Sequence, residues 1–418
     1  MKNIFVIGGG IVGLCTAYFL HKEGCKVTVI DKSSITDGAS FVNAGYISPS
    51  HIISLASPGM LKLGLQSMFK KDAPFYMKAR WDVSFFNWAY QFYKSATYEK
   101  VRKAIPVIKD ISLLSMDLYN EIMKSEDLGT FYWKKDGLLL LYKTQKAADK
   151  EFKTVKIALK EGLEVTNLSR EQLLELEPHV HDDVKGGFWY KCDAHSTPNE
   201  FMKKMYNFLE SSGVTFLCNE KVVDLQVENS KITKVITERS AFEVDELVIA
   251  AGSWTGILSK KLNLNIPVQA GKGYSINTYR DVGINYPAVL MESKVAVTPM
   301  KGFTRFAGTM EFSGNNNIIR PERVRAIAKA AGSYYVGLEL NENELKEAKC
   351  GLRPVSPDGL PFIGRPPQLQ NLVVAAGHAM MGWSMGPATG KLVCEIIHSK
   401  KPSMPIEPFS ITRFGKSQ

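Results

Sequence analysis

Two groups of residues in this sequence could do chemistry, and the first is near the N-terminus. Gly8, Gly10 and Gly13 have the G-x-G-x-x-G spacing, and Asp31 ends the next apolar run. Glycines at this spacing make a tight turn, let the backbone approach a pyrophosphate and let a helix pack closely on a strand. A carboxylate at Asp31 can accept hydrogen bonds from a ribose diol. The pattern predicts a dinucleotide site, and by itself it suits NAD as well as FAD.

The second group centres on Arg353, in the sequence Gly351-Leu352-Arg353-Pro354. A guanidinium group binds a carboxylate through two parallel hydrogen bonds, so Arg353 could hold a ligand that carries a carboxylate. The alternative is an arginine that satisfies loop carbonyls. Tyr274 and His51 are further candidates for this pocket, although each could equally be a structural side chain.

A parallel sheet must position the glycine motif. Residues 4–7 and 27–30 are short apolar runs typical of buried parallel strands, and a helical pattern between them ends at Gly24. The later runs 243–250 and 372–376 have the same character and end in small residues. Because ligands bind at the carboxyl ends of such strands, these distant runs are expected to complete the nucleotide site.

The remaining segments predict a second unit with a mostly antiparallel sheet, built from β-rich runs between residues 256 and 349. Helices are expected over 106–128 and 146–161, and a closing helix from about 386 to 398. The fold class is therefore α/β with a discontinuous nucleotide domain. The predicted division gives residues 1–55, 195–256 and 350–418 to the nucleotide domain, and 56–194 and 257–349 to a substrate domain.

Composition is that of a globular protein, with 418 residues, 45% of them hydrophobic, and a formal net charge of +10. This length suggests about two domains. No apolar run reaches the roughly 20 residues that span a bilayer, and the run 4–20 fits a strand, turn and helix better than a signal peptide. The six cysteines form no C-x-x-C pair, so we expect no metal site, no disulfides and a reducing, cytoplasmic setting.

Residues 60–105 differ from the rest, because nine basic and eleven aromatic residues occur there with three acidic ones. A basic, aromatic, amphipathic segment can lie in a membrane interface, which would put the protein at the inner face of the membrane. The alternative is a helical flap packed on its own domain. Nucleic acid is not an expected partner, since no recognised binding module accompanies the charge.

Several motifs occur in order along the whole chain. After the glycine motif and Asp31 come Ala250-Ala251-Gly252-Ser253-Trp254-Thr255, Gly351-Leu352-Arg353-Pro354, Asp358-Gly359-Leu360-Pro361-Phe362-Ile363-Gly364, and the stretch from Gly377-His378 to Gly390. With this set the chain resembles the D-amino-acid oxidase superfamily of FAD-dependent oxidoreductases. Segments 39–45 and 48–51 look most like its D-amino-acid dehydrogenase branch. The resemblance implies a glutathione-reductase-type FAD-binding Rossmann domain and a substrate domain with a mixed sheet.

The resemblance also implies where FAD would bind without a covalent bond. The closing helix would point its N-terminus at the flavin N1 and C2 oxygen, where negative charge develops on reduction. The expected cofactor residues are Gly8, Gly10, Ile11, Val12, Gly13, Asp31, Lys32, Ala39, Ser40, Asn43, Ala44, Gly45, Val222, Ala251, Gly252, Trp254, Arg353, Gly377, His378, Met381, Gly382, Trp383 and Ser384.

The implied reaction is the oxidative deamination of a D-amino acid to a 2-oxo acid and ammonia, with hydride transfer to flavin N5. Arg353 would bind the substrate carboxylate, and a quinone or similar acceptor would take the electrons. Other oxidases of the superfamily carry a second arginine where this chain has Ala379-Met380-Met381, which counts against a glycine or sarcosine oxidase using oxygen. Further alternatives are a secondary amine such as D-proline or hydroxyproline, an NAD-linked dehydrogenase, and a protein that keeps FAD for structure or acts as a membrane-docked partner.

Overall fold

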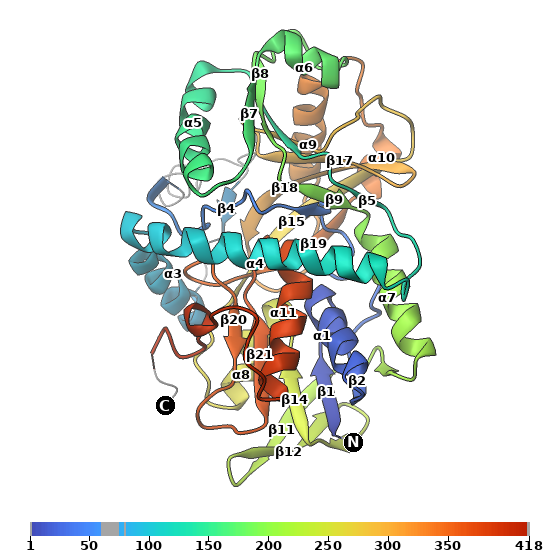
Figure 1. Cartoon of the computed structure of the whole chain (residues 1–418), viewed down its shortest axis with the longest axis vertical. Coiled ribbons are helices and arrows are strands. Elements are labelled where there is room, and N and C mark those ends of the chain that lie inside the picture. Colours follow the sequence, from blue (N-terminus) through green and yellow to red (C-terminus); the bar gives the residue numbers. More distant parts are fainter. Residues whose placement is uncertain (1, 60–74, 79–80, 416–418) are drawn as a thin grey trace.

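A six-stranded sheet forms the lower half of the molecule in Figure 1. The computed structural model describes residues 2–59, 75–78 and 81–415. Across this sheet lie β10 (Thr215–Leu217), β2 (Lys26–Ile30), β1 (Asn3–Ile7), β14 (Glu246–Ile249), β21 (Leu372–Ala376) and β20 (Phe362–Gly364). Neighbours are parallel except β20, which is antiparallel to β21. Continuous apolar sequence forms the central strands because both faces of the sheet are covered.

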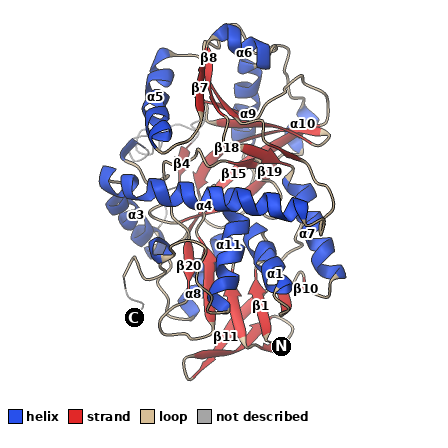
Figure 2. Ribbon diagram, in the orientation of Figure 1, coloured by secondary structure: helices blue, strands red, loops and turns tan. Residues whose placement is uncertain are grey.

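Helices cover one face of this sheet and a small sheet covers the other (Figure 2). The first face packs against α1 (Ile11–Lys22), α4 (Tyr98–Lys124), α7 (Pro198–Ser211) and α11 (Gly382–Ile397). The second packs against α8 (Thr255–Lys261) and the sheet of β11 (Val222–Glu228), β12 (Lys231–Thr237) and β13 (Ala241–Glu243). The expected arrangement of strands, glycine turn and helix at the start of the chain is confirmed.

The upper half contains the predicted mixed sheet, which is mostly antiparallel. In order it contains β19 (Lys349–Val355), β15 (Gln269–Thr278), β18 (Phe303–Phe312), β17 (Val295–Met300), β16 (Ala288–Leu290), β6 (Leu138–Tyr142), β8 (Gly186–Tyr190) and β7 (Val165–Leu168), and β4 (Phe75–Met77) pairs with β18. Only the β16–β6 and β18–β4 pairs among these described strands are parallel. The sheet carries α5 (Gln145–Lys160), α6 (Arg170–Leu176), α9 (Pro321–Tyr334) and α10 (Glu342–Lys346).

A third, small sheet links the two halves. It consists of β3 (Tyr46–Ile47), β9 (Ala194–Ser196) and β5 (Trp133–Lys134). The long helix α4 runs across the front of the molecule between the halves (Figure 1). The division into domains stays a prediction, with one difference: β19, which it gave to the nucleotide domain, pairs with β15 in the mixed sheet.

Two helix boundaries differ from the prediction. α11 begins at Gly382 and not near residue 386. Its first turn contains glycine, and Pro387 lies inside the helix without ending it. α4 begins at Tyr98 and not at residue 106, since Thr97 caps it and the helix continues through Pro106. Proline and glycine are usual helix boundary residues, but Pro106 and Pro387 lie inside these helices.

Candidate active site

The six-stranded sheet brings the predicted cofactor residues to one edge. Strands β2, β1, β14 and β21 are neighbours and run parallel, so their carboxyl ends meet. These ends lead into Asp31, the turn that starts at Gly8, the pair Ala251 and Gly252, and Gly377. The structure therefore gathers residues from distant stretches around one place, as the sequence predicted.

The turn after β1 has a backbone geometry that requires glycine. Gly8 has a φ angle of 112°, and a Cβ atom there would lie 2.4 Å from the carbonyl oxygen of Ala250. A Cβ atom on Gly13 would lie 1.8 Å from the Gly8 carbonyl oxygen, because α1 packs directly on the turn. A Cβ atom on Gly10 would meet only Ser40 Oγ within 4 Å, at 3.3 Å, so the turn opens on this side.

The N-terminus of α1 can receive an anion. Its N-cap residue, Gly10, has no side chain to cap the helix, and the first turn has N–H groups without an intrahelical acceptor. Ser40 Oγ accepts one of them, from Ile11 at 3.0 Å. Unpaired N–H groups and the helix dipole together favour a bound pyrophosphate.

Asp31, the residue predicted to bind the ribose, directly follows β2. Its carboxylate accepts a hydrogen bond from the Gly9 N–H at 2.7 Å. The Glu220 N–H donates to the Asp31 carbonyl oxygen at 2.8 Å, which brings the start of β11, with Val222, beside this strand end.

Lys32 and Trp254 contact each other at the same edge. Lys32 Nζ lies 3.3 Å from the centre of the Trp254 ring, and burial lowers the pKa of Lys32. Gly252 has a φ angle of 54°, and a Cβ atom there would meet nothing within 4 Å. The backbone at the end of β14 therefore borders open space.

Segment 39–45 is fixed to the underside of the mixed sheet. Arg305 Nη1 donates to the carbonyl oxygen of Asn43 at 2.6 Å, and Thr298 Oγ1 donates to that of Ala44 at 2.7 Å. Burial lowers the pKa of Arg305 to about 10. This segment thus joins the edge of the parallel sheet to the mixed sheet, whose strand β19 carries Arg353.

The polar side chains after β21 are committed to internal contacts. His378 is buried, and its Nε2 forms a hydrogen bond with the Thr389 hydroxyl of α11 at 2.9 Å. Burial lowers the pKa of His378 to about 3. Trp383 Nε1 donates to Ser196 Oγ at 3.0 Å, and Ser384 Oγ donates to the Tyr46 carbonyl oxygen at 2.9 Å. What this loop can offer a cofactor is its backbone, including the first-turn N–H groups of α11.

These features fit FAD. The uncapped N-terminus of α1 suits the pyrophosphate, and Asp31 suits the ribose. The first turn of α11 offers a second set of N–H groups, at a helix end without a side-chain cap. The roles of the individual residues stay predictions.

Arg353 lies on β19, directly opposite Gly271 of β15. Its guanidinium group covers Gly273, where a Cβ atom would lie 2.2 Å from Nη1. Nη1 donates to the carbonyl oxygen of Thr309 at 2.6 Å. Burial lowers the pKa of Arg353 to about 10, and no acidic side chain among the described residues compensates for that burial. A buried guanidinium group in this state can take a ligand carboxylate.

Tyr274 lies on the opposite face of the sheet from Arg353. Side chains alternate along β15, so a residue next to Gly273 points the other way, toward α9. Tyr274 is 1% exposed, its hydroxyl donates to Glu311 at 2.7 Å, and it belongs to the same core cluster as Ile327. The structure therefore does not bring Tyr274 to the predicted pocket.

His51 lines a narrow cavity together with Met380 and Met381. His51 is exposed, and desolvation by the surrounding protein lowers its pKa. The Ala379 N–H donates to the Pro354 carbonyl oxygen at 2.8 Å, which joins the cavity wall to the strand of Arg353. The methionines make this wall apolar.

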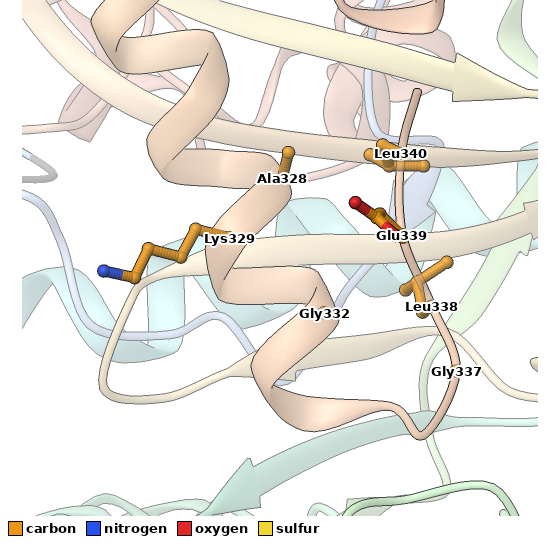
Figure 3. Close-up of a pocket in the computed structure, with 7 residues that line it drawn as sticks. All are labelled: Ala328, Lys329, Gly332, Gly337, Leu338, Glu339 and Leu340. Atoms are coloured by element: carbon orange, nitrogen blue, oxygen red, sulfur yellow. The ribbon is translucent and has the colours of Figure 1, made fainter. Parts of the chain in front are cut away.

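A shallow groove of about 520 Å³ lies away from these residues, between α9 and segment 337–340 (Figure 3). Ala328, Lys329, Leu338 and Leu340 are among the residues that line it. It lies on the helix-covered side of the mixed sheet and holds none of the predicted site residues.

The sequence analysis missed Arg305 and Thr309, which both contact the site through backbone carbonyls. A single arginine or threonine in a strand carries no local pattern. The one available indication was the pair Gly271 and Gly273, since glycines in a strand often mark the close approach of another group.

Comparisons with known proteins agree with this architecture. The family model of FAD dependent oxidoreductases matches residues 3–396. A D-amino acid dehydrogenase of Helicobacter pylori is 31% identical over 400 residues, which cover 94% of each chain. One from Rhizobium rhizogenes is 28% identical over 428 residues, covering 99% of this chain and 100% of the other.

Solved structures with low sequence identity have the same fold. Glycine oxidase from Geobacillus kaustophilus superposes with a TM-score of 0.77 at 20% identity, with 99% of each chain covered. L-proline dehydrogenase from P. horikoshii gives 0.74 at 22% identity, covering 99% of this chain and 97% of the other.

The protein belongs to the family of FAD-dependent oxidoreductases. It is an enzyme that uses FAD. The glycine turn, the N-terminus of α1 and Asp31 are consistent with this cofactor.

Proposed function

We propose that this enzyme oxidises D-amino acids to 2-oxo acids and ammonia. The observation that carries the proposal is Arg353, a buried guanidinium group that has the Thr309 carbonyl oxygen as an acceptor and no acidic neighbour among the described residues. Two further N–H groups on the guanidinium fork would bind the substrate carboxylate. The relatives named D-amino acid dehydrogenase support this choice of substrate.

The protein residues would bind and orient the substrate. With its carboxylate on Arg353, the substrate would lie between the mixed sheet and the edge where FAD fits, and its side chain would extend toward the apolar wall of Met380 and Met381. FAD, when bound, accepts the α-hydrogen of the amine as hydride at N5. Hydrolysis of the resulting imine gives the 2-oxo acid and ammonia. The methionines favour substrates with apolar side chains.

The direct test is anaerobic reduction of the purified flavoprotein by single amino acids. We expect D-alanine and larger apolar D-amino acids to bleach the flavin absorbance, and their L-enantiomers to leave it unchanged. Bleaching by D-proline or hydroxyproline alone would favour the secondary-amine alternative. The proposal would be overturned if L-amino acids bleached the flavin absorbance, or if no amino acid bleached it.

We further propose a quinone in the membrane as the electron acceptor. The outer face of α3 (Val83–Ser95) supports contact with a membrane, because Phe86, Tyr90 and Tyr93 are exposed at helical spacing. Trp81, just before the helix, is 99% exposed. Aromatic side chains of this kind are enriched at membrane interfaces. Residues 60–74 and 79–80 of the predicted basic, aromatic segment lie outside the described residues.

The inner face of α3 packs on the candidate site. Phe85, Trp88 and Phe92 are buried, and Trp88 Nε1 donates to the Val355 carbonyl oxygen at 2.9 Å. The described part of the predicted flap therefore does pack on its own protein, as the alternative expected, while its other face stays exposed. Lys94 Nζ lies 4.4 Å from the centre of the Tyr90 ring and adds positive charge to this exposed face.

No helix among the described residues is long and apolar enough to cross a membrane. The contact that we propose is peripheral, through insertion of aromatic rings and attraction of lysines to anionic lipid.

A vesicle flotation assay tests the membrane proposal. We expect the protein to float with vesicles containing anionic phosphatidylglycerol and to remain below neutral vesicles. The double variant Phe86→Ser, Tyr93→Ser should lose flotation. The matched control Phe152→Ser, Leu159→Ser changes exposed apolar residues of α5 and should keep it. Equal flotation of both variants would contradict the role of α3.

A further inference from the structure

A β-bulge lies beneath Arg353 in the mixed sheet. Thr309 and Met310 of β18 together oppose the single residue Gly273 of β15. Thr309 has a φ angle of 69°, in the left-handed region where glycine usually occupies the first position of such a bulge. A β-branched residue is strained there. Strain of this kind persists only where the surrounding structure holds it, so the bulge must be held by other contacts.

Both sides of the bulge contact Arg353. On the bulged strand, the Thr309 carbonyl oxygen accepts the hydrogen bond from Nη1 at 2.6 Å. On the facing strand, the guanidinium group fills the place of the missing side chain of Gly273, with atoms 2.2–2.4 Å from where a Cβ would be. The bulge therefore supplies both the floor and the acceptor that fix the plane of this guanidinium group.

Glu311 anchors the strand just after the bulge. It is fully buried and lies 3.2 Å from Lys272 Nζ, 3.2 Å from Arg323 Nε and 3.3 Å from Arg320 Nε. The Tyr274 hydroxyl donates to it at 2.7 Å. One carboxylate thus holds β15, the start of α9 and β18 together on the face opposite Arg353.

We infer that Glu311 and Thr309 are positioning residues, which orient Arg353 toward the ligand carboxylate through the bulge. Glu311 acts across the sheet: its contacts keep β18 in register beyond the bulge, and the strained Thr309 then aims its carbonyl oxygen at Nη1. This also gives Tyr274 a role, since its hydroxyl is one of the contacts of Glu311. The inference rests on the proposed function only in identifying the ligand as the substrate.

The test measures carboxylate binding without turnover. Propionate, which is D-alanine without its amino group, is titrated into the oxidised holoenzyme while the flavin absorbance is followed. We expect Glu311→Gln to raise the Kd for propionate about tenfold and the KM for a D-amino acid similarly, with kcat and flavin content little changed. Thr309→Gly, which adopts the same φ without strain, should keep the Kd within about twofold of the wild type.

The matched control is Glu177→Gln. Glu177 is also fully buried, but it accepts hydrogen bonds from the backbone of Asn285 and Tyr286. This variant can lose stability and should keep the wild-type Kd. If Glu311→Gln does not fold, Tyr274→Phe removes one contact of Glu311 and should raise the Kd about threefold.

Unchanged propionate Kd and KM in both Glu311→Gln and Tyr274→Phe would overturn the inference. So would a rise in Kd in Glu177→Gln equal to that in Glu311→Gln, because the effect would then be a general loss of structure. If no D-amino acid reduces the wild type while propionate binding still weakens in Glu311→Gln, the proposed substrate fails and the positioning role stands. If D-amino acids reduce wild type and variants with equal KM, the positioning role fails alone.

Discussion

Two arginines of the mixed sheet have the same direction of pKa shift and differ in their partners. Burial lowers the pKa of both Arg305 and Arg353 to about 10. Arg305 donates to Asn277 Oδ1 at 2.9 Å and to the carbonyl oxygens of Phe41 and Asn43. Arg353 donates to one oxygen, that of Thr309.

The difference separates a structural cation from one that can bind a ligand. Arg305 donates its guanidinium N–H groups to segment 39–45 and holds it in place. Few of these donors remain for another molecule. Most guanidinium N–H groups of Arg353 have no described acceptor. Burial of a charged group without partners costs free energy. A substrate carboxylate would remove that cost, which explains why the two guanidinium groups are not interchangeable.

Substitution of Arg353 should have the largest effect on activity. Arg353→Met would remove both hydrogen bonds to the carboxylate, each about 1.5–3 kcal/mol, so we expect kcat/KM to fall on the order of 10³-fold. Arg353→Lys keeps the charge without the fork and should recover only a small part. Flavin content should stay normal in both variants. Steady-state kinetics that show wild-type kcat/KM in Arg353→Lys would contradict a bidentate carboxylate site.

Substitution of Arg305 should act on stability first. Arg305→Met would leave the partly buried carbonyl oxygens of Phe41 and Asn43 without these donors, and we expect the free energy of unfolding to fall by about 2–4 kcal/mol. Because segment 39–45 lies at the predicted FAD site, the variant should also lose flavin on dilution. Urea unfolding and flavin release measure both. A stable, fully loaded Arg305→Met with weakened propionate binding would reverse the roles of the two arginines.

The same comparison shows what the sequence can and cannot predict. The glycine turn, Asp31 and the parallel strands were predictable, because each depends on neighbours within one βαβ unit. Arg353 was identified because it lies in the Gly351-Leu352-Arg353-Pro354 motif and a guanidinium group binds carboxylates. Arg305 was not, since its partners lie in a segment far away in the chain.

The position of Tyr274 could not be predicted for a different reason. It stands directly beside Gly273 in the sequence, but alternation along β15 turns it to the opposite face. The face that each residue occupies depends on the bulge at Thr309 and on pairing with β19, and neither is visible in one sequence. The start of α11 was missed because its first turn contains glycine and precedes Pro387, which are usual boundary residues.

The comparison of the two arginines can be extended to a buried acid, Asp193. Its hydrogen-bond partners are neutral groups of Ser50. Asp193 is 1% exposed and accepts hydrogen bonds from the Ser50 N–H at 3.0 Å and the Ser50 hydroxyl at 2.6 Å. Burial raises the pKa of Asp193 to about 6, although the hydrogen bonds from Ser50 lower it in part. In the unfolded chain this acid releases its proton near pH 4.

The sign of the pH effect follows from linkage. Between about pH 4 and pH 6 the unfolded chain binds fewer protons than the native protein, so this group makes stability fall as the pH rises. Asp193→Asn cannot ionise, and its stability relative to the wild type should improve by about 2 kcal/mol between pH 4 and pH 7. Urea unfolding at both values measures this. A difference independent of pH would show that hydrogen bonds from Ser50 alone keep the charge at little cost.

The smallest effect is expected from a single methyl group placed under Arg353. In Gly273→Ala the new Cβ would lie 2.2–2.4 Å from guanidinium atoms, so the side chain must shift away from Thr309. A displaced fork should weaken propionate binding about tenfold, near 1.4 kcal/mol, and raise KM more than it lowers kcat. The matched control is Gly364→Ala in β20, where a Cβ would meet nothing within 4 Å. Equal Kd values for wild type, Gly273→Ala and the control would mean that Arg353 binds no carboxylate from this position. A loss of flavin in Gly273→Ala would place Arg353 with Arg305, as a residue that holds the fold.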